Sequence, residues 1–312
     1  MKPKAILTTA VFFAAMFLLV SAANAAEYAF CSDTWYSGGC TCSGDPISPP
    51  PALTSDDTVN VCSGTWSIGS DINVAAIVVE SGATMAMGAN VETDTLTVYG
   101  TVTTGAYTLT ITGASGLTIT STGLLDVNAT NGAVDLTGGG THTITPTNIN
   151  LGLRLSATGA YLCISADTTI SGTGYIEGRH NDAVILIDST KTLVNEVVVQ
   201  GALTVSASGA TFQNDDTVLA NYAASGTQDT LLFDAGTITG TGTGTFEVNT
   251  PGATMEFDAT DVNATAIRGS LTISAGTLDC ETDVAFLSPQ SFSMTGTDST
   301  INVAPGATFE AH

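Results

Sequence analysis

Basic residues are scarce in this sequence of 312 residues. Lys and Arg total 6 against 29 Asp and Glu, which gives a formal net charge of −23 at pH 7. Because so few cations cannot neutralise phosphates or anionic headgroups, the composition argues against nucleic acid and anionic membranes as partners. Charged residues make up only 11% of the chain, so the imbalance reflects missing bases more than abundant acids. We interpret the acidity as keeping an exposed protein soluble.

Long hydrophobic runs are missing after the N-terminal segment. Lys2 and Lys4 open the chain, residues 6–20 are apolar, and residues 23–25 form an Ala-Asn-Ala cleavage pattern. The apolar stretch of about 15 residues is shorter than the roughly 20 that a spanning helix needs. We therefore predict a signal peptide over residues 1–25 and an exported mature chain without a membrane span. The expected location is extracellular or on the cell surface, with the periplasm as the alternative.

Cysteine is sparse and unevenly placed. Four of the six cysteines lie close to the N-terminus, namely Cys31, Cys40, Cys42 and Cys62. Since an exported chain meets an oxidising compartment, we predict two disulfides among these four. A bond between Cys40 and Cys42 is disfavoured because one intervening residue rarely permits the required geometry, and the other connectivities stay open. No histidine lies nearby to complete a zinc site, and whether another metal is bound stays open.

Residues 26–67 differ in composition from the rest of the chain. They contain both tryptophans, the four clustered cysteines and a run of three prolines. This composition predicts a compact N-terminal cap stapled by disulfides. Residues 57–61 near its end predict a first strand, with Val59 and Val61 on one face.

Amphipathic helix patterns are also missing, and the best candidate is a short segment over residues 216–224. Short segments in which apolar residues alternate with threonine are common instead, for example at residues 96–98, 109–111 and 271–273. Successive side chains of a strand point to opposite faces, so the apolar residues would enter a core and the threonines would face outward. The pattern predicts an all-β protein.

Repetition along the chain favours one all-β architecture. Gly82, Gly209, Gly252 and Gly306 each open a Gly-Ala-Thr-Met or Gly-Ala-Thr-Phe turn, where glycine would supply a positive φ. Degenerate repeats of this kind fit a solenoid whose turns vary in length, whereas the hairpin turns of the rival β-sandwich are missing. We predict a single-stranded parallel β-helix over residues 68–312, with about 10 to 12 rungs of roughly 20 to 25 residues.

The predicted architecture has a consequence for Cys163 and Cys280. They are 117 residues apart, which corresponds to about five rungs or roughly 24 Å along the axis. A disulfide tolerates a Cα separation of only about 7 Å. We therefore expect these two cysteines not to be bonded to each other.

Coils at residues 79–85, 96–102 and 170–176 resemble those of bacterial pectin-lyase-like β-helix proteins, including autotransporter-passenger and filamentous-adhesin segments. The resemblance covers most of residues 68–312 and lies at the level of the fold. It implies a right-handed coil, and it implies polysaccharide cleavage as the commonest enzymatic use of such a fold. A shared fold does not by itself carry an activity.

Few residues could carry polysaccharide cleavage by acid–base chemistry. The weak candidates are Arg179, His180, Asp182, Asp215 and Asp216. They are faintly similar to the Gly-His-Gly and Asp-Asp elements of polygalacturonases, but their order differs and the later Arg-x-Lys element has no counterpart. Adjacent carboxylates in a strand point to opposite faces, so we interpret these residues as polar turns and expect neither a catalytic site nor a cofactor.

Threonine pairs raise a different alternative. Thr-x-Thr occurs at residues 101–103, 108–110, 118–120 and 141–143, and a regular array of such pairs could bind ice. The pairs begin 7, 10 and 23 residues apart, which does not fit a single ladder. His142, inside the last pair, is expected to point outward from its strand.

These patterns favour a secreted or cell-surface structural or adhesive protein that works through its extended faces. A polysaccharide or another cell-surface molecule is the expected partner. A polysaccharide-active lyase or hydrolase is the alternative, and an ice-binding protein is the second alternative. The sequence ends after a Gly-Ala-Thr-Phe turn without a polar cap, which predicts either self-association through the last rung or a longer parent protein.

Overall fold

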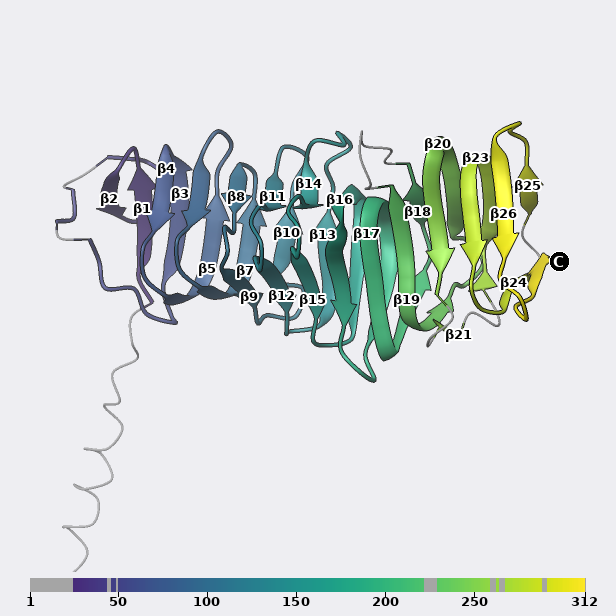
Figure 1. Cartoon of the computed structure of the whole chain (residues 1–312). Helices are drawn as coiled ribbons and strands as arrows, with labels where there is room; N and C mark the ends of the chain where they lie inside the picture. Colours follow the sequence, from purple (N-terminus) through teal and green to yellow (C-terminus); the bar gives the residue numbers. More distant parts are fainter. Residues whose placement is uncertain are drawn as a thin grey trace, which may run out of the picture.

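The computed structural model describes residues 25–43, 46–48, 50–221, 229–258, 262–263, 267–287 and 291–311. The predicted signal peptide lies outside these ranges, apart from its last residue. Every regular element within them is a β-strand, which confirms the all-β prediction (Figure 1). No helix in this part of the chain is long and apolar enough to cross a membrane.

The strands follow one another at short intervals. In chain order they are β1 (Glu27–Cys31), β2 (Thr34–Ser37), β3 (Thr58–Ser63), β4 (Thr65–Ile68), β5 (Ile72–Val79), β6 (Thr84–Met87), β7 (Val91–Val98), β8 (Thr101–Thr103), β9 (Thr108–Ile111), β10 (Leu117–Ile119), β11 (Leu124–Val127), β12 (Ala133–Leu136), β13 (Gly140–Ile144), β14 (Gly152–Leu155), β15 (Tyr161–Ile164), β16 (Thr168–Ile187), β17 (Thr192–Asn214), β18 (Thr217–Ala220), β19 (Thr230–Thr239), β20 (Thr245–Phe257), β21 (Val262–Asn263), β22 (Ile267–Arg268), β23 (Ser270–Cys280), β24 (Val284–Leu287), β25 (Phe292–Met294), β26 (Ser299–Val303) and β27 (Phe309–Ala311).

Parallel pairing between strands that are distant in the sequence organises the described chain. The exceptions are the antiparallel hairpin of β1 with β2 and a single antiparallel bridge between Trp35 and Ile47. Near the C-terminal end, β22, β24 and β27 form a separate sheet of three parallel strands. The other pairs form three columns, which the chain visits in turn. Figure 1 shows the strands following one another from the N-terminal end in purple to the C-terminal end in yellow, so the molecule is elongated.

Each column can be followed through the pairings. The first column runs through β1, β3, the second halves of β5 and β7, β10 and β13. The second runs through β4, β6, β8, β11 and β14. The third runs through the first halves of β5 and β7, β9, β12 and β15. Beyond these strands, β16 and β17 each pass through more than one column without a break.

The apolar residues of the columns stack on one another to form the core. Eleven residues of the second column are partners in succession, namely Trp66, Met85, Val102, Leu125, Leu153, Ile176, Val199, Val218, Phe246, Leu271 and Phe292. All of them except Phe292 are buried. The step along the chain is 17 residues from Met85 to Val102 but 28 from Leu125 to Leu153. The turns therefore vary in length while the inward positions stay in register.

The strand predicted at residues 57–61 exists, but it is not the first. It corresponds to β3, whose Val59 and Val61 are fully buried as predicted. The strands β1 and β2 precede it, because Ala29 and Phe30 supply earlier apolar residues that also enter the core.

The short helix considered at residues 216–224 is not formed in the described part of that segment. Residues 217–220 form β18 instead. Val218 and Ala220 are two residues apart and are both fully buried. Burial of every second residue is the pattern of a strand and not of a helix. Residues 222–224 lie outside the described ranges.

The repeated Gly-Ala-Thr turn has the predicted backbone conformation. The φ angle is 81° at Gly82 and 85° at Gly252, a region that L side chains rarely adopt. At both sites the following alanine and methionine are buried, while the threonine between them is partly exposed. The motif therefore redirects the chain with the correct face inward, just before β6 at Gly82 and within the continuous strand β20 at Gly252.

Two disulfides staple the N-terminal segment, in keeping with the sequence prediction. Cys31 pairs with Cys42 and Cys40 with Cys62, with Cα separations of 5.8 and 5.5 Å. Cys31 ends β1 and Cys62 lies in the adjacent β3, so the bridges fix the residues after β2 to the start of the first column. The boundary between residues 67 and 68 stays a prediction, because β3 and β4 already pair in parallel with β5 and β6.

Candidate functional site

The structure places the sequence-predicted catalytic candidates in two different connections. Arg179, His180 and Asp182 lie in β16 where it passes from its pairing with β14 to its pairing with β15, which is the corner between the second and third columns. Asp215 and Asp216 form the turn between β17 and β18, where the chain enters the second column. The two groups thus belong to different corners, and neither corner combines all five residues.

The contacts of the His180 ring include those of a polar turn. Its Nε2 lies 2.7 Å from the Thr158 hydroxyl, and its Nδ1 accepts the backbone N–H of Asp182 at 3.4 Å. The Asp182 carboxylate lies 3.7 Å from the same Nδ1. Both ring nitrogens are thus engaged with neighbouring chain, which supports the interpretation of this segment as a structural corner.

Successive strands of one column are called levels below. Asp215 serves as a hydrogen-bond acceptor for its own turn and for a residue on the next level. It accepts the backbone N–H of Thr241 at 2.9 Å, the Thr241 hydroxyl at 2.7 Å and the Gln213 amide at 2.6 Å. Burial raises the pKa of this carboxyl, but the hydrogen bonds outweigh it and leave the pKa below its ordinary value. Asp215 therefore stays ionised and engaged, which does not suit a general acid.

A cluster of three charged residues on the second column was missed by the sequence analysis. One carboxylate oxygen of Glu177 lies 3.1 Å from Nε of Arg154 and 3.1 Å from a terminal nitrogen of Arg179. Arg154 also donates to the Asn150 carbonyl at 2.7 Å. Only 9% of Arg154 and 6% of Glu177 is exposed. A buried carboxylate that contacts two guanidinium groups through one oxygen forms a structural ion pair.

His142 is buried, so the prediction that it points outward is wrong. It is 0% exposed and is the register partner of Ile170. Its Nδ1 accepts the backbone N–H of Leu117 at 3.0 Å, while its Nε2 is buried without a partner among the described residues. Burial lowers the pKa of His142 to about 4, so the ring is neutral at physiological pH. A neutral, enclosed imidazole is a core residue.

The two remaining cysteines differ in position, because Cys280 is buried in the core whereas Cys163 lies on the partly exposed side of β15. Cys163 and Cys280 are free, as expected for residues on distant levels. Burial raises the pKa of the Cys163 thiol to about 11 and that of Cys280 to about 12. Both remain protonated at neutral pH and are poor nucleophiles.

Carboxylates gather on the third column towards the C-terminal end. Glu256 in β20 is the register partner of Asp279 in β23. Burial raises the pKa of Glu256, and the neighbouring Asp279, Asp258 and Glu281 raise it further. Burial and the neighbouring like charges together account for the raised pKa of Glu256, and a cluster of acids alone does not define a metal site.

Potential metal ligands approach one another elsewhere, near the disulfides. Within the described ranges, Cys31, Cys42 and Cys62 are the group whose ligand atoms lie together, within 4.8 Å of one another. Their sulfurs are already bonded in Cys31–Cys42 and Cys40–Cys62. The group therefore offers no thiolate to a metal ion.

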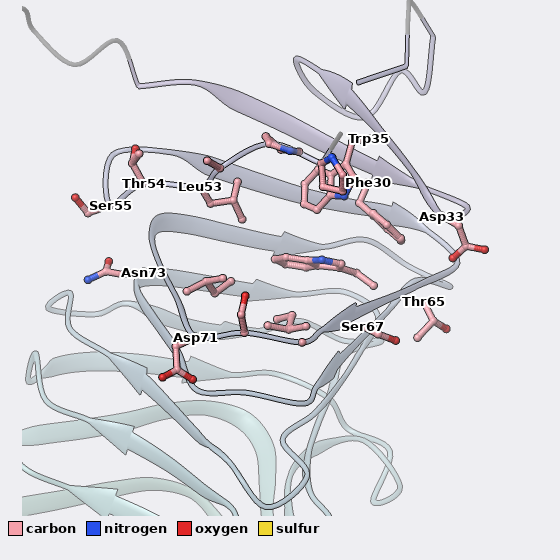
Figure 2. Close-up of a pocket in the computed structure, with 18 residues that line it drawn as sticks. Phe30, Asp33, Trp35, Leu53, Thr54, Ser55, Thr65, Ser67, Asp71 and Asn73 are labelled. Atoms are coloured by element: carbon pink, nitrogen blue, oxygen red, sulfur yellow. The ribbon is translucent and has the colours of Figure 1, made fainter. Parts of the chain in front are cut away.

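A pocket of about 690 Å³ opens at the N-terminal end of the stack (Figure 2). Its inner side is formed by Phe30, Trp35 and Trp66, whose rings contact one another with centroid separations between 5.4 and 6.4 Å. Asp33 and Asp71 lie on its rim, where Figure 2 shows them well apart. This pocket combines an apolar wall with peripheral polar groups, as ligand sites in proteins commonly do.

Comparison with known proteins adds no family to this description. No family model matches the chain, and no curated protein or solved structure matches it. Function has to be inferred from the stacked strands, the engaged charged residues and the N-terminal pocket.

Proposed function

We propose that the chain forms a right-handed, single-stranded parallel β-helix that is exported and acts outside the cell as a structural or adhesive element. The three columns of parallel pairs support the architecture. The eleven successive partners from Trp66 to Phe292 would give a stack about 50 Å long at about 4.8 Å per level. The right-handed coil rests on the resemblance to pectin-lyase-like proteins.

The outward positions of the columns carry the functional proposal. In the first column Thr97, Thr118 and Thr143 are successive register partners, and all three are partly exposed. Short hydroxyl side chains in register make a flat surface with repeated hydrogen-bonding groups. Such a surface suits contact with an extended partner, for example a polysaccharide or another cell-surface molecule, better than enclosure of a small substrate.

The state of the acid–base residues supports the same proposal. Asp215 is held by Thr241, and Glu177 is held between Arg154 and Arg179. General acid–base catalysis needs a group that can reach the substrate and exchange a proton. Groups that already satisfy the protein's own hydrogen bonds are poorly placed for that work.

A polysaccharide screen tests this proposal directly. The mature chain, residues 26–312, is incubated with a panel of soluble polysaccharides with and without calcium, and binding and release of reducing or unsaturated ends are both measured. We expect binding to at least one polymer without release of new ends.

Release of ends would instead establish the lyase or hydrolase alternative. In that case the first variants would be Arg179→Gln, His180→Gln and Asp215→Asn, whose effects would show which corner carries the chemistry. The absence of binding to every polymer, with no cleavage, would contradict the polysaccharide as partner.

Ice binding is a second candidate, favoured by one observation. The threonine pairs seen in the sequence fall on different columns, but β10 and β13 are paired, so Thr118 and Thr120 lie beside Thr143 and Thr145. Tyr99 occupies the corresponding outward position one level earlier, after Thr97. The regular ladder is therefore short, and we expect no thermal hysteresis in an ice-growth assay. Measurable hysteresis that is lost in a Thr143→Tyr variant would make ice binding the better function.

A further inference from the structure

The strand β4 has an open edge at the N-terminal end of the second column. On one side it pairs with β6, and no other strand of the described residues pairs with it. In the first column the corresponding place before β3 is filled by β1. After β1 the chain does not continue into the second column. Ser32 and Asp33, with φ angles of 47° and 69°, turn it back into β2.

The backbone groups on this open edge can be assigned from the register. The carbonyls of Gly64 and Ile68 accept N–H groups of Thr84 and Gly88, on the β6 side. Because successive residues of a strand direct their backbone groups to opposite sides, those of Thr65 and Ser67 point to the open side. Within the described ranges no backbone partner is found for them.

The pocket lies alongside this edge. All four residues of β4 line it, and Figure 2 shows Thr65 and Ser67 towards its outer side. Trp66 and Ile68 are buried, whereas Thr65 and Ser67 are exposed. A strand added here would meet an apolar surface with every second side chain and solvent with the others.

The rim of the pocket is acidic. Asp33 and Asp71 are both exposed, and Asp71 accepts one backbone N–H, from Asn90 at 2.9 Å. No lysine or arginine occurs in the sequence between residues 5 and 153. The carboxylates at the pocket therefore have no cationic partner among the neighbouring levels, and they complement a basic ligand.

We propose that the edge of β4 is a binding site for an extended peptide that adds as a strand. The peptide would alternate apolar and polar residues and carry basic residues near its ends. Main-chain hydrogen bonds to Thr65 and Ser67 would supply binding, and the apolar residues would fill the pocket beside Trp66. This site is independent of the adhesive function proposed above, since it involves the end of the stack and not its outward faces.

A second copy of this chain fits the edge less well. The basic residues after the predicted signal peptide are Arg154, Arg179, Lys191 and Arg268, which lie within or directly before paired strands. A folded copy therefore offers no extended basic segment. Its net negative charge would also oppose an acidic rim.

Tryptophan fluorescence can test the proposal, because both tryptophans of the chain line the pocket. The probe is a synthetic seven-residue peptide that alternates valine with threonine and has arginine at each end. A peptide of the same composition, ordered so that the alternation is lost, is the ligand control. We expect saturable binding of the alternating peptide and at least about tenfold weaker binding of the control.

Two substitutions at one exposed position separate main-chain from side-chain recognition. Ser67→Pro removes an N–H on the open edge, and proline is tolerated at edge strands when its nitrogen faces away from the partner. We expect this variant to bind the peptide at least about tenfold more weakly. Ser67→Ala keeps the N–H, and its affinity should stay within about twofold of the parent. Asp33→Asn should weaken binding several-fold at low salt and little at high salt.

Several results would overturn the proposal. Equal loss in Ser67→Ala and Ser67→Pro would indicate recognition through the hydroxyl, as a sugar would require. The same holds if oligosaccharides change the fluorescence and the peptide does not. Should Ser67→Pro fail to fold, hydrogen exchange of the parent protein decides. Slower exchange of the Thr65 or Ser67 amide with peptide supports strand addition, and unchanged exchange refutes it.

Discussion

Replacing Gly201 by alanine is expected to destabilise the protein by about 4 kcal/mol. Gly201 has a φ of 96°, and it is the register partner of Gly178 on the preceding level. A Cβ atom at this position would overlap the carbonyl oxygen of Gly178, which belongs to the backbone and cannot move aside. The change therefore combines backbone strain with a steric clash between two levels. Urea unfolding of the purified mature chain measures the loss.

Gly252→Ala is the matched control for this effect. Gly252 also has a positive φ, 85°, but no atom lies within 4 Å of the Cβ that alanine would add. Only the conformational cost of about 1–2 kcal/mol should remain. Equal losses in the two variants would show that the contact between Gly178 and Gly201 is not tight, which contradicts the structure.

Acidification should destabilise the protein through His142. Its folded-state pKa is about 4, against an ordinary value of 6.5. Above pH 6.5 the ring is neutral in both states. Between pH 6.5 and 4 the unfolded state takes up a proton that the folded state refuses, so stability falls as the pH falls through this range. The shift corresponds to about 3 kcal/mol, because one pKa unit is worth about 1.4 kcal/mol.

The substitution His142→Leu isolates this contribution. Leucine matches the leucine that occupies the same inward position at residue 117, although it leaves the Leu117 N–H without its acceptor. Denaturant unfolding of both proteins from pH 7 to pH 4 gives a difference curve in which other titrating groups cancel. We expect the parent to lose about 3 kcal/mol more than the variant over this range.

His180→Gln serves as the control for the number of histidines. It removes a histidine from a surface corner and leaves His142 in place, so this variant should keep the acid-dependent loss of stability that is assigned to His142. A flat difference curve between the parent and His142→Leu would mean that the His142 imidazole is accessible to protons in the folded state, contrary to its burial.

Local patterns were sufficient to predict most of the strands. Val59 and Val61 enter the core as their alternation indicated, and Gly82 has the positive φ that its turn demanded. These features depend on neighbouring residues only, so the sequence contains all the necessary information. The disulfide-bonded N-terminal segment was recognisable from composition for the same reason.

The wrong prediction for His142 arose because the polarity of this residue was given more weight than the inward and outward alternation of side chains along its strand. His142 lies between Thr141 and Thr143, so the same alternation that turns Thr143 outward turns His142 inward. A hydrogen bond from Leu117 makes this burial tolerable. That contact joins two levels 25 residues apart, and the sequence does not reveal which residues become partners.

Register between levels also explains what was missed at the charged cluster and at the pocket. Arg154 and Glu177 are direct partners, but turns of unequal length hide the pairing in the sequence. The open edge of β4 depends on the reversal at Ser32 and Asp33, which have no strong turn signature. Both features could be recognised only when the order of the columns was known.

The regular spacing of some successive partners has an evolutionary consequence. Leu153, Ile176 and Val199 are successive partners that are 23 residues apart each time. A duplication or loss of one such segment would leave the inward and outward alternation of every remaining strand unchanged. The length of the molecule can therefore change in increments of about 4.8 Å without the invention of a new interface, so that a lineage could adjust the distance this protein spans by unequal recombination alone.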